Sequence, residues 1–409
     1  IDDNKVHNTY KTEGENGSAY GRGIFIGPSK YNITVSNVTV QNNEVYDIHA
    51  QGCFAVYPTW GYDNARAENI LVRNNIFRDS GDAYTGATSY GIYIKDEVVN
   101  AIFEYNTIYN NKLGIIIATY ATEAIGVPTG ITIRYNLIYS NRMQGLDIVN
   151  TGNRTFDMSF YGNILYENVT ATAAGGVAEI QVSAADYGTS VINIYNNTIY
   201  STDNNAIDYP CAVHLGNFGG GAGVTGTPTI NFKNNVIYTE NYAAIWDIND
   251  VLIHSNNLIY RGGGDGPWVK IGKNLNPTYY GGTGNDPVTT WEGTAQVSNP
   301  AFTGGTLPSC FSNGVGACGT GTYGTDMVPN TTYFSLQAGS PALGNGATLG
   351  TPYNSAINWA GTNLGRTRPS GAYDIGAYQE GFNADSTGAV LKFGTGAKVR
   401  PGGAKVILR

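Results

Sequence analysis

The sequence predicts an all-β protein, a right-handed parallel β-helix, and three observations support this. A short phrase of Asn, an aliphatic residue and an aromatic residue occurs eight times, at intervals of 22–38 residues, which is the repeat length of solenoids and propellers. Short runs of alternating apolar and polar residues flank each copy, without convincing helical periodicity. Gly (55 residues) and Tyr (30) are abundant, and charged residues make up only 13%, as in turn-rich β proteins.

Each repeat contains two or three predicted strands. An alternating strand precedes the Asn, as in TINFK (229–233), and a turn and a second strand follow the aromatic residue, as in GIYIK (91–95) and GLDIV (145–149). Leucine-rich repeats would need Leu at fixed positions, which is not found. The pattern predicts about nine coils over residues 20–275, with the variation in repeat length placed in loops.

The repeated Asn is predicted to lie at a corner between two sheets. There it tolerates a left-handed backbone, and its amide bonds to the equivalent Asn one coil above and one below. The aliphatic residue would point into the core, and the aromatic residues would stack along one side. This predicted ladder is structural and consists of Asn43, Asn74, Asn106, Asn136, Asn163, Asn197, Asn235 and Asn257.

We expect three parts: β-helix coils over 1–275, an irregular Gly-rich region over 276–380 that closes the solenoid, and a basic tail over 381–409. The tail alternates apolar and basic residues in AVLKF, AKVR and AKVILR. It could be a sorting segment, a last strand of its own body, or a strand given to another subunit. We favour self-association through 386–409, with the coil near 23–26 as acceptor.

The coil pattern resembles that of secreted right-handed parallel β-helix proteins of the pectate-lyase-like superfamily. YFSLQAGSPALGNGA (333–347) and NLGRTRPSGAYDIGAYQE (363–380) resemble the closing signature of many bacterial surface and exported β-helix proteins. The resemblance implies the fold and an extracellular or cell-surface location. It does not imply a reaction, because the activities of those proteins are diverse or unknown.

The second strands predict a column of outward side chains, one per coil and ~4.8 Å apart. Its middle is polar and lies between two aromatic residues, an arrangement that suits a saccharide chain, because rings stack on sugar faces and carboxylates bind hydroxyls or transfer protons. The predicted column is Phe25, Phe54, Tyr93, Ile116, Asp147, Glu179, His214, Trp246 and Lys270.

The candidate catalytic residues are Asp147, Glu179 and His214. On neighbouring coils, the two carboxylates could approach the ~5–5.5 Å separation of a retaining glycosidase. Two alternatives stay open: the polar residues form an ordinary solvated surface, or Gln181 takes the place of Glu179. The candidate carbohydrate-binding residues are Tyr93, Trp246, Arg142 and Arg154.

Known enzyme signatures of this fold are largely missing. The sequence has neither the Asp-rich and Gly-His-Gly motifs of polygalacturonases nor the Ca²⁺-binding acidic cluster and downstream Arg of pectate lyases. Lys95 could serve as a lyase base, but a single Lys at a strand end more often aids solubility. We therefore expect no cofactor, and no motif indicates Ca²⁺.

Charge and hydropathy exclude some partners. The net charge of −8 and the lack of a basic face before the tail argue against nucleic acid, and no apolar run approaches the ~20 residues of a membrane span. The chain begins at Ile1 without a signal peptide, so we expect a processed form.

The chain has four cysteines and seven sequons, and in a chain this rich in Asn and Thr most of the sequons should arise by chance. Cys310 and Cys318 bracket a Gly-rich loop and are a disulfide candidate, whereas Cys53 and Cys211 lie about five predicted coils apart and should not be bonded. The glycosylation candidates are Asn16, Asn32, Asn37, Asn153, Asn168, Asn196 and Asn330.

Two function classes follow. The preferred one is an extracellular surface or matrix β-helix protein, a self-assembling filament subunit that engages polysaccharide or a cell-surface glycan. The alternative is a polysaccharide-degrading hydrolase or lyase that acts along the outward column.

Overall fold

The computed structural model describes most of the chain up to residue 304 and parts of the remainder. The described residues are 1–9, 21–49, 51–58, 64–81, 89–119, 126–150, 155, 157–169, 178–184, 190–202, 211–216, 228–240, 242–263, 266–272, 277–304, 307, 333–356, 366–367 and 373–378.

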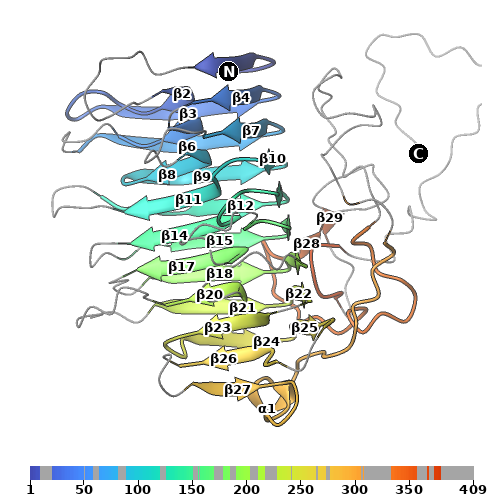
Figure 1. Ribbon diagram of the computed structural model, residues 1–409. Helices are drawn as coiled ribbons and strands as arrows, with labels where there is room; N and C mark the ends of the chain where they lie inside the picture. The colour runs from blue at the N-terminus through green and yellow to red at the C-terminus, as the bar shows by residue number, and fades with distance from the viewer. Residues whose placement is uncertain are drawn as a thin grey trace, which may run out of the picture.

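Three long sheets run along the molecule, and each coil adds one strand to each sheet (Figure 1). Sheet A contains β3 (Thr34–Gln41), β6 (Arg66–Arg73), β9 (Val98–Glu104), β12 (Ile131–Arg134), β15 (Asp157–Tyr161), β18 (Val191–Tyr195), β21 (Thr229–Lys233) and β24 (Leu252–Ser255). Sheet B contains β1 (Lys5–Thr9), β4 (Glu44–Ile48), β7 (Ile76–Ser80), β10 (Thr107–Tyr109), β13 (Leu137–Tyr139), β16 (Ile164–Tyr166), β19 (Thr198–Ser201), β22 (Val236–Thr239) and β25 (Leu258–Arg261).

Sheet C completes each coil, and all strand pairs in the three sheets are parallel except the last pair of sheet C. It contains β2 (Arg22–Ile26), β5 (Gly52–Val56), β8 (Tyr90–Lys95), β11 (Leu113–Thr119), β14 (Leu146–Asn150), β17 (Ile180–Ala184), β20 (Cys211–Leu215), β23 (Ala243–Asp247), β26 (Val269–Ile271) and β27 (Thr278–Tyr280). The chain is thus a right-handed parallel β-helix, as predicted.

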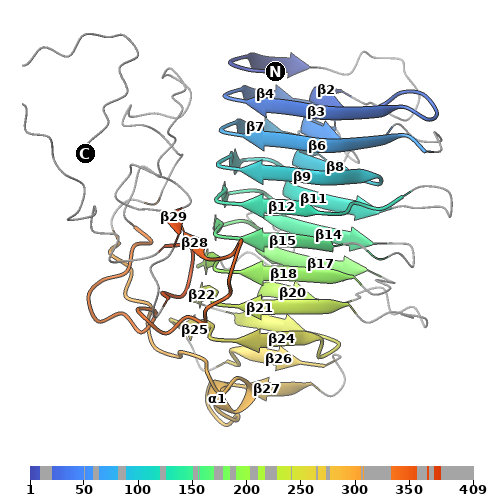
Figure 2. The same cartoon turned by 180° about the vertical axis from the view of Figure 1, so that it is seen from behind.

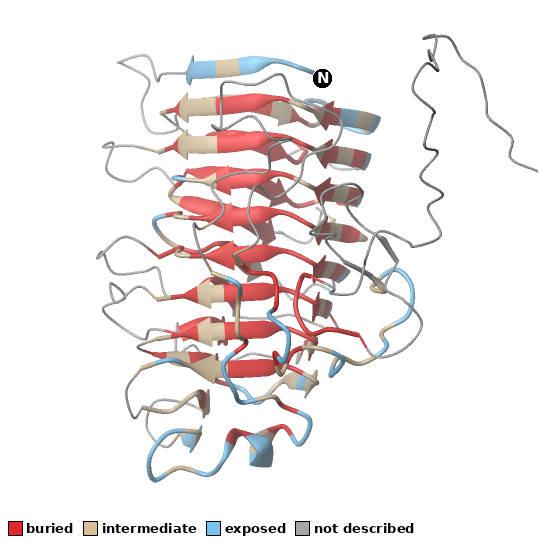
Figure 3. Cartoon of the chain, turned by 90° about the vertical axis from the view of Figure 1, so that its right-hand side faces the viewer, coloured by how far each residue is buried: buried red, intermediate tan, exposed pale blue. Residues whose placement is uncertain are grey.

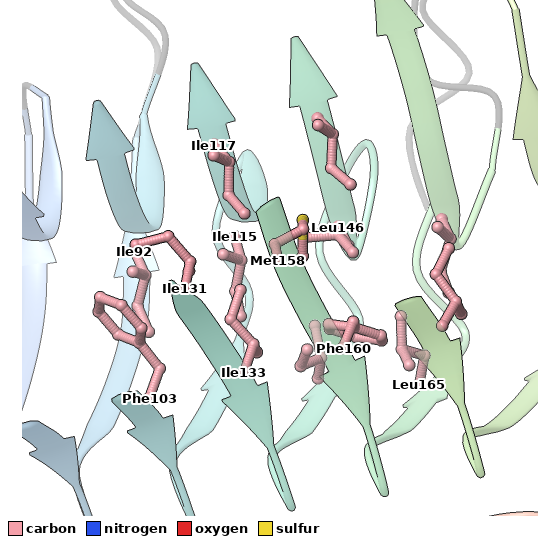
Figure 4. Packing of buried hydrophobic residues seen from close by; sticks show 14 of the residues in the cluster. Ile92, Phe103, Ile115, Ile117, Ile131, Ile133, Leu146, Met158, Phe160 and Leu165 are labelled. Carbon is pink, nitrogen blue, oxygen red and sulfur yellow. The ribbon is translucent and has the colours of Figure 1, made fainter. Parts of the chain in front are cut away.

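The core is a set of aliphatic and aromatic columns inside the coils. Ile115 pairs with Ile92 and Leu146 in sheet C, and opposite them Phe103 and Phe160 flank Ile133 in sheet A. Figure 4 shows these side chains pointing toward one another between the sheets, and all are buried. Branched and aromatic residues favour this stacking because they pack well on a pleated surface.

The predicted Asn ladder exists at the corner between sheets A and B, with one correction. Successive amides are joined by Nδ2–H···Oδ1 bonds of 2.9–3.1 Å. Asn75, not Asn74, is the member from its coil, because Arg78 rather than Phe77 pairs with the neighbouring Tyr46. The copy NNIF is therefore shifted by one residue, and Phe77 points into the core.

The left-handed backbone is found one residue before each ladder Asn, not at the Asn itself. Asn42, Asn74 and Asn196 have φ values of 57°, 55° and 54°. This turn directs the following amide into the interior, where its backbone N–H and its Nδ2 both donate to the next Oδ1, as Asn136 does to Asn163.

The predicted aromatic stack lies on the outer face of sheet B. Tyr139 stacks on Tyr109 and Tyr166, with ring centroids 4.9 and 4.8 Å apart, and Tyr200 stacks on Tyr238 at 4.8 Å. These separations equal the strand spacing, so the rings add apolar contact at each coil without distorting the sheet.

A second ladder, which the sequence analysis missed, lies where sheet B passes into sheet C. Asn111 donates to Asn141 and Asn141 donates to Asn168, at 3.1 and 2.8 Å. Glycine at the start of the facing strands makes room, since a Cβ at Gly114 would lie 3.0 Å from the Asn141 amide nitrogen and 2.4 Å from the Gly145 oxygen.

The two ends of the solenoid differ. At the C-terminal end β27 runs antiparallel to β26, and the short helix α1 (Val288–Trp291) stacks Trp291 on His254 with ring centroids 3.8 Å apart. At the N-terminal end β1 is largely exposed, as Figure 3 shows.

The described parts of the closing signature lie beside the coils, not across an end (Figure 2). Gly376 donates to the Asn234 carbonyl at 2.7 Å and Ala377 to the Thr198 hydroxyl at 3.1 Å, and Tyr353 bonds Ser159 at 2.8 Å. The antiparallel pair β28 (Ser355–Ala356) and β29 (Arg366–Thr367) belongs to the same region. The tail over 381–409 lies outside the described residues, and the three-part division stays a prediction.

Removing one rung should destabilise the whole stack. Asn136→Ala removes the Oδ1 that accepts from the Asn106 backbone N–H and Nδ2–H, and one of the two donors to the Asn163 Oδ1, in a buried site, so we expect a loss of about 1–3 kcal/mol in the free energy of unfolding. Urea unfolding measures it. Asn231→Ala is the matched control, because that amide lies on the outer face of sheet A and donates to Asn193. Equal losses in the two variants would contradict a special role for the ladder.

Candidate functional site

The outward column of sheet C is present, with two of its nine predicted members replaced. Strand register places Ala55, not Phe54, beside Tyr93, and Gln181, not Glu179, beside Asp147 and His214. The observed column is Phe25, Ala55, Tyr93, Ile116, Asp147, Gln181, His214, Trp246 and Lys270. Phe54 is a fully buried core residue.

Glu179 ends the second Asn ladder. Its carboxyl oxygens accept the backbone N–H and the Nδ2–H of Asn168, so it occupies the position that the next ladder Asn would hold. It is buried in the interior, and burial raises the pKa of Glu179 to about 8. The prediction that Glu179 lies in the outward column beside Asp147 is therefore wrong, and the open alternative with Gln181 is confirmed for the register.

The loss of Glu179 from the column changes the chemistry available there. Asp147 now has a carboxamide, Gln181, as its neighbour, so the predicted retaining carboxylate pair is not formed. The next ionisable group is His214, two strands or ~9.6 Å away along the column.

The lower end of the column is built around Trp246. The His214 ring meets the indole edge to face at 5.3 Å, and the Lys270 ammonium lies 3.7 Å from the indole centroid. The indole Nε1–H donates to the Gly272 carbonyl at 3.1 Å, which fixes its orientation. A cation over an indole face is a favourable contact, so the three side chains hold each other in place.

Burial sets the charge of this end. It lowers the pKa of His214 to about 3, with a further contribution from the positive charge of Lys270. Burial also lowers the pKa of the Lys270 ammonium. His214 is thus a neutral imidazole at ordinary pH, able both to donate and to accept a hydrogen bond.

Gln181 in the centre of the column is held by Gln144. The Gln144 amide donates to the Gln181 Oε1 at 2.7 Å, and both side chains are buried. The sequence analysis missed Gln144, which lies in the turn before β14. The one indication of it in the sequence was its position directly before Gly145, which starts the predicted strand GLDIV that carries the candidate residue Asp147.

The upper end of the column is aromatic. Tyr93 meets Tyr57 at 5.3 Å and Tyr90 at 4.6 Å between ring centroids. Lys95, the alternative lyase base, is largely buried and forms an ion pair with Asp96 at 2.8 Å, which does not fit a solubilising surface lysine either.

The remaining predicted binding residues are only partly placed. Arg142 is exposed in the turn before β14, beside the strand that carries Asp147. Arg154 lies outside the described residues. The sequence analysis placed four of the candidate site residues in the column where the structure has them, and all four are buried. They are Tyr93, Asp147, His214 and Trp246.

The cysteines and the predicted glycosylation sites differ in how far they are buried. Cys53 and Cys211 are buried thiols outside any disulfide. They lie on β5 and β20 of sheet C with four strands between them, so they are too far apart to be bonded to each other, as predicted. Asn168 and Asn196 are also buried and donate to Glu179 and to the Tyr353 carbonyl, which argues against their glycosylation. Asn32 and Asn37 are exposed. Asn16, Asn153, Asn330, Cys310 and Cys318 lie outside the described residues.

Two whole-chain properties bear on partners. Among the described residues, no group of three or more His, Cys, Asp or Glu side chains is arranged to hold a metal ion. In the same part of the chain, no helix has the length and apolar character needed to cross a membrane.

Comparison with known proteins adds only distant similarities. No protein-family model matches the sequence, and no curated protein matches it significantly. A crystal structure of PfbA, a surface adhesin of Streptococcus pneumoniae, aligns over 60% of this chain and 64% of its own at 12% identity and a TM-score of 0.39. The A-module of a mannuronan C-5 epimerase of Azotobacter vinelandii aligns over 67% and 80% at 16% identity and a TM-score of 0.31. At these values neither structure indicates a ligand or an activity for this chain.

Glu179, at the end of the second Asn ladder, should make the free energy of unfolding depend on pH. The pKa of Glu179 is about 8 in the folded chain against an ordinary value of 4.5, so between these values the folded chain keeps a proton that the unfolded chain releases. The free energy of unfolding should then fall as pH rises from about 5 to 8. Glu179→Gln removes this component and should flatten the profile.

Urea unfolding at several pH values measures the effect, with Glu68→Gln on the outer face of sheet A as the control. Parallel profiles for Glu179→Gln and the wild-type chain would contradict the assignment.

Proposed function

We propose that this chain is an extracellular β-helix protein of a cell surface or matrix that binds a polysaccharide along the outward column of sheet C. The observation that carries the proposal is the run of Asp147, Gln181 and His214 on three consecutive strands, between the aromatic residues Tyr93 and Trp246. The extracellular location rests on the sequence alone, through the resemblance of the closing segment.

The spacing of the column favours a repeating ligand. Each strand contributes one side chain about every 4.8 Å. The carboxylate of Asp147, the carboxamide of Gln181 and the imidazole of His214 are buried, so an extended polymer parallel to the solenoid axis would meet them in turn only once the column becomes accessible. These three groups provide both donors and acceptors for hydroxyls. Aromatic side chains at the two ends supply the flat apolar surfaces on which sugar rings stack.

The charge of the column favours a neutral glycan. Asp147 is the one acidic residue among the nine column residues, Lys270 is the one Lys or Arg, and His214 is neutral because its pKa is about 3. The column as a whole is therefore balanced, in a chain with a net charge of −8. A strongly anionic polymer would be repelled by the body and would find a single ammonium, Lys270, in the column.

The alternative function is a polysaccharide-degrading enzyme in which Asp147 and the neutral His214 act on the bound chain. The neutral imidazole favours it, because a general base must be unprotonated at working pH. Against it stands the absence of a second carboxylate from the nine-residue column, since a two-carboxylate hydrolase needs a pair.

Binding is tested by affinity electrophoresis and calorimetry with a panel of neutral glucans, xylans and mannans and of polyuronates. Asp147→Asn keeps the size of the side chain and removes its charge, so we expect at least a tenfold loss of affinity for the best neutral glycan, about 1.4 kcal/mol. Thermal unfolding should change little. Asp157→Asn is the matched control, because the Asp157 carboxylate belongs to sheet A and is exposed. Unchanged affinity in Asp147→Asn would refute the site.

The enzyme alternative is tested on the same panel by release of reducing ends and by absorbance of unsaturated products. Turnover that disappears in both Asp147→Asn and His214→Gln would establish the enzyme, whereas binding without products supports the surface or matrix role.

A further inference from the structure

Tyr200 and Tyr333 form a hydrogen-bonded pair between the solenoid and the stretch 333–356 that lies beside it. Tyr200 belongs to β19 of sheet B. The two phenol oxygens lie 3.0 Å apart, and the rings meet edge to face with centroids 5.7 Å apart and planes inclined at 76°. The two residues are 133 positions apart in the sequence, so a covalent bond between them would tie this stretch to the coils.

Both partners of this pair are held in place by other contacts. The Tyr333 carbonyl accepts the Gly304 N–H at 3.1 Å, and the next residue, Phe334, is buried with its ring centroid 5.5 Å from that of Tyr200. Tyr200 in turn stacks on Tyr238 at 4.8 Å. The backbone and the packing therefore set the approach of the two phenols. Both rings are partly exposed, so small oxidants can reach them.

Oxidised phenols couple in a geometry that this pair already approaches. A tyrosine that loses one electron and its phenolic proton becomes a radical, whose unpaired electron is shared by the oxygen and the carbons ortho to it. Two such radicals join through a C–C bond between ortho carbons, and each ring then passes its ortho hydrogen to its oxygen, which restores the aromatic ring and the hydroxyl. The two hydroxyls of the product flank the new bond, and the ring planes are twisted. The observed pair likewise has adjacent hydroxyls and steeply inclined rings.

We propose that Tyr200 and Tyr333 are a site of oxidative modification, joined as dityrosine by hydrogen peroxide and a haem peroxidase. The two phenols together release two electrons and two protons, which convert one peroxide molecule into two molecules of water. A cross-link over a long loop stabilises a fold because it lowers the entropy of the unfolded chain. The cross-link would therefore staple the stretch 333–356 to sheet B, independently of saccharide binding by the column.

Other tyrosine contacts are less suited to this coupling. Tyr109 and Tyr139 are stacked with planes at 9° on paired strands of sheet B, and strand pairing opposes the turn that a twisted product requires. Tyr353 and Tyr195 meet edge to face at 4.6 Å, but each hydroxyl bonds to the Asn193 amide, at 3.2 and 3.1 Å. We therefore expect the proposed pair to couple first.

Peptide mapping of the oxidised full chain tests the site. The chain is treated at low concentration with a haem peroxidase and stepwise additions of hydrogen peroxide, and dityrosine fluorescence follows the yield. After digestion, mass spectrometry should find the peptides that contain residues 200 and 333 joined with the loss of two hydrogen atoms. The yield per chain should not change with protein concentration, because the reaction is within one chain. Dityrosine that maps to other pairs, or that forms only between chains, would overturn the proposal.

Phenylalanine substitutions test the two residues. Tyr200→Phe and Tyr333→Phe each keep the ring and remove one phenol, so each should lower the yield of dityrosine within the chain at least tenfold. Tyr353→Phe is the matched control, because it removes the hydroxyl of another tyrosine of the same stretch that meets a sheet residue edge to face, and it should keep the yield. Equal yields in the three variants would refute the assignment.

Urea unfolding tests whether the cross-link acts as a staple. The oxidised wild-type chain should unfold at a higher urea concentration than the untreated chain. Oxidised Tyr200→Phe should unfold at the same urea concentration as untreated Tyr200→Phe, which separates the cross-link from other effects of peroxide. A mapped cross-link that leaves the midpoint of the wild-type chain unchanged would contradict the stapling role.

Discussion

The amide ladder at the corner between sheets A and B is the interaction on which the rest of this structure depends. A parallel β-helix must turn sharply in every coil, and each turn leaves backbone N–H and C=O groups in the interior. One Asn per coil satisfies them, because its Nδ2–H reaches both a carbonyl of the neighbouring turn and the next Oδ1, as Asn106 does with Val72 and Asn136. This repeated bond fixes the register of the coils, and the register in turn fixes which side chains share a column.

Both ladders run in one direction and end on a carboxyl group. Every amide donates toward the C-terminal end, so the last Nδ2–H needs an acceptor that requires no further donor. Glu292 supplies it for the first ladder and Glu179 for the second. A carboxyl group suits this position because its two oxygens can accept the backbone and the side-chain N–H of the same Asn. A buried Glu beside a candidate site is thus explained by the fold, without a role in chemistry.

The column of sheet C shows how the scaffold positions function. Inward residues must be apolar to fill the core, which leaves the outward position of each strand free to vary. In the upper coils that position holds aromatic and aliphatic residues, and from Asp147 onward it holds polar residues and Trp246. Second contacts then orient them: Gln144 holds Gln181, and Trp246 lies between His214 and Lys270. These contacts fix the side chains in position on the sheet.

The sequence by itself determined the fold class, the first ladder apart from Asn74, the stacked tyrosines and most of the outward column. This was possible because a solenoid repeats one local pattern, and a repeated local pattern can be recognised in the sequence. Tertiary structure decided the rest. The shift at NNIF, the inward Phe54 and the change from Glu179 to Gln181 are each displacements of one or two residues, which only pairing with the neighbouring coils resolves. The second ladder was missed although its amides, Asn111, Asn141 and Asn168, each lie two residues after a Tyr. Only the packing of neighbouring coils shows that Glu179, directly before β17, accepts from the last of them. The places of Glu292, of α1 and of the closing segment depend on contacts between residues far apart in the chain, and no local pattern encodes those.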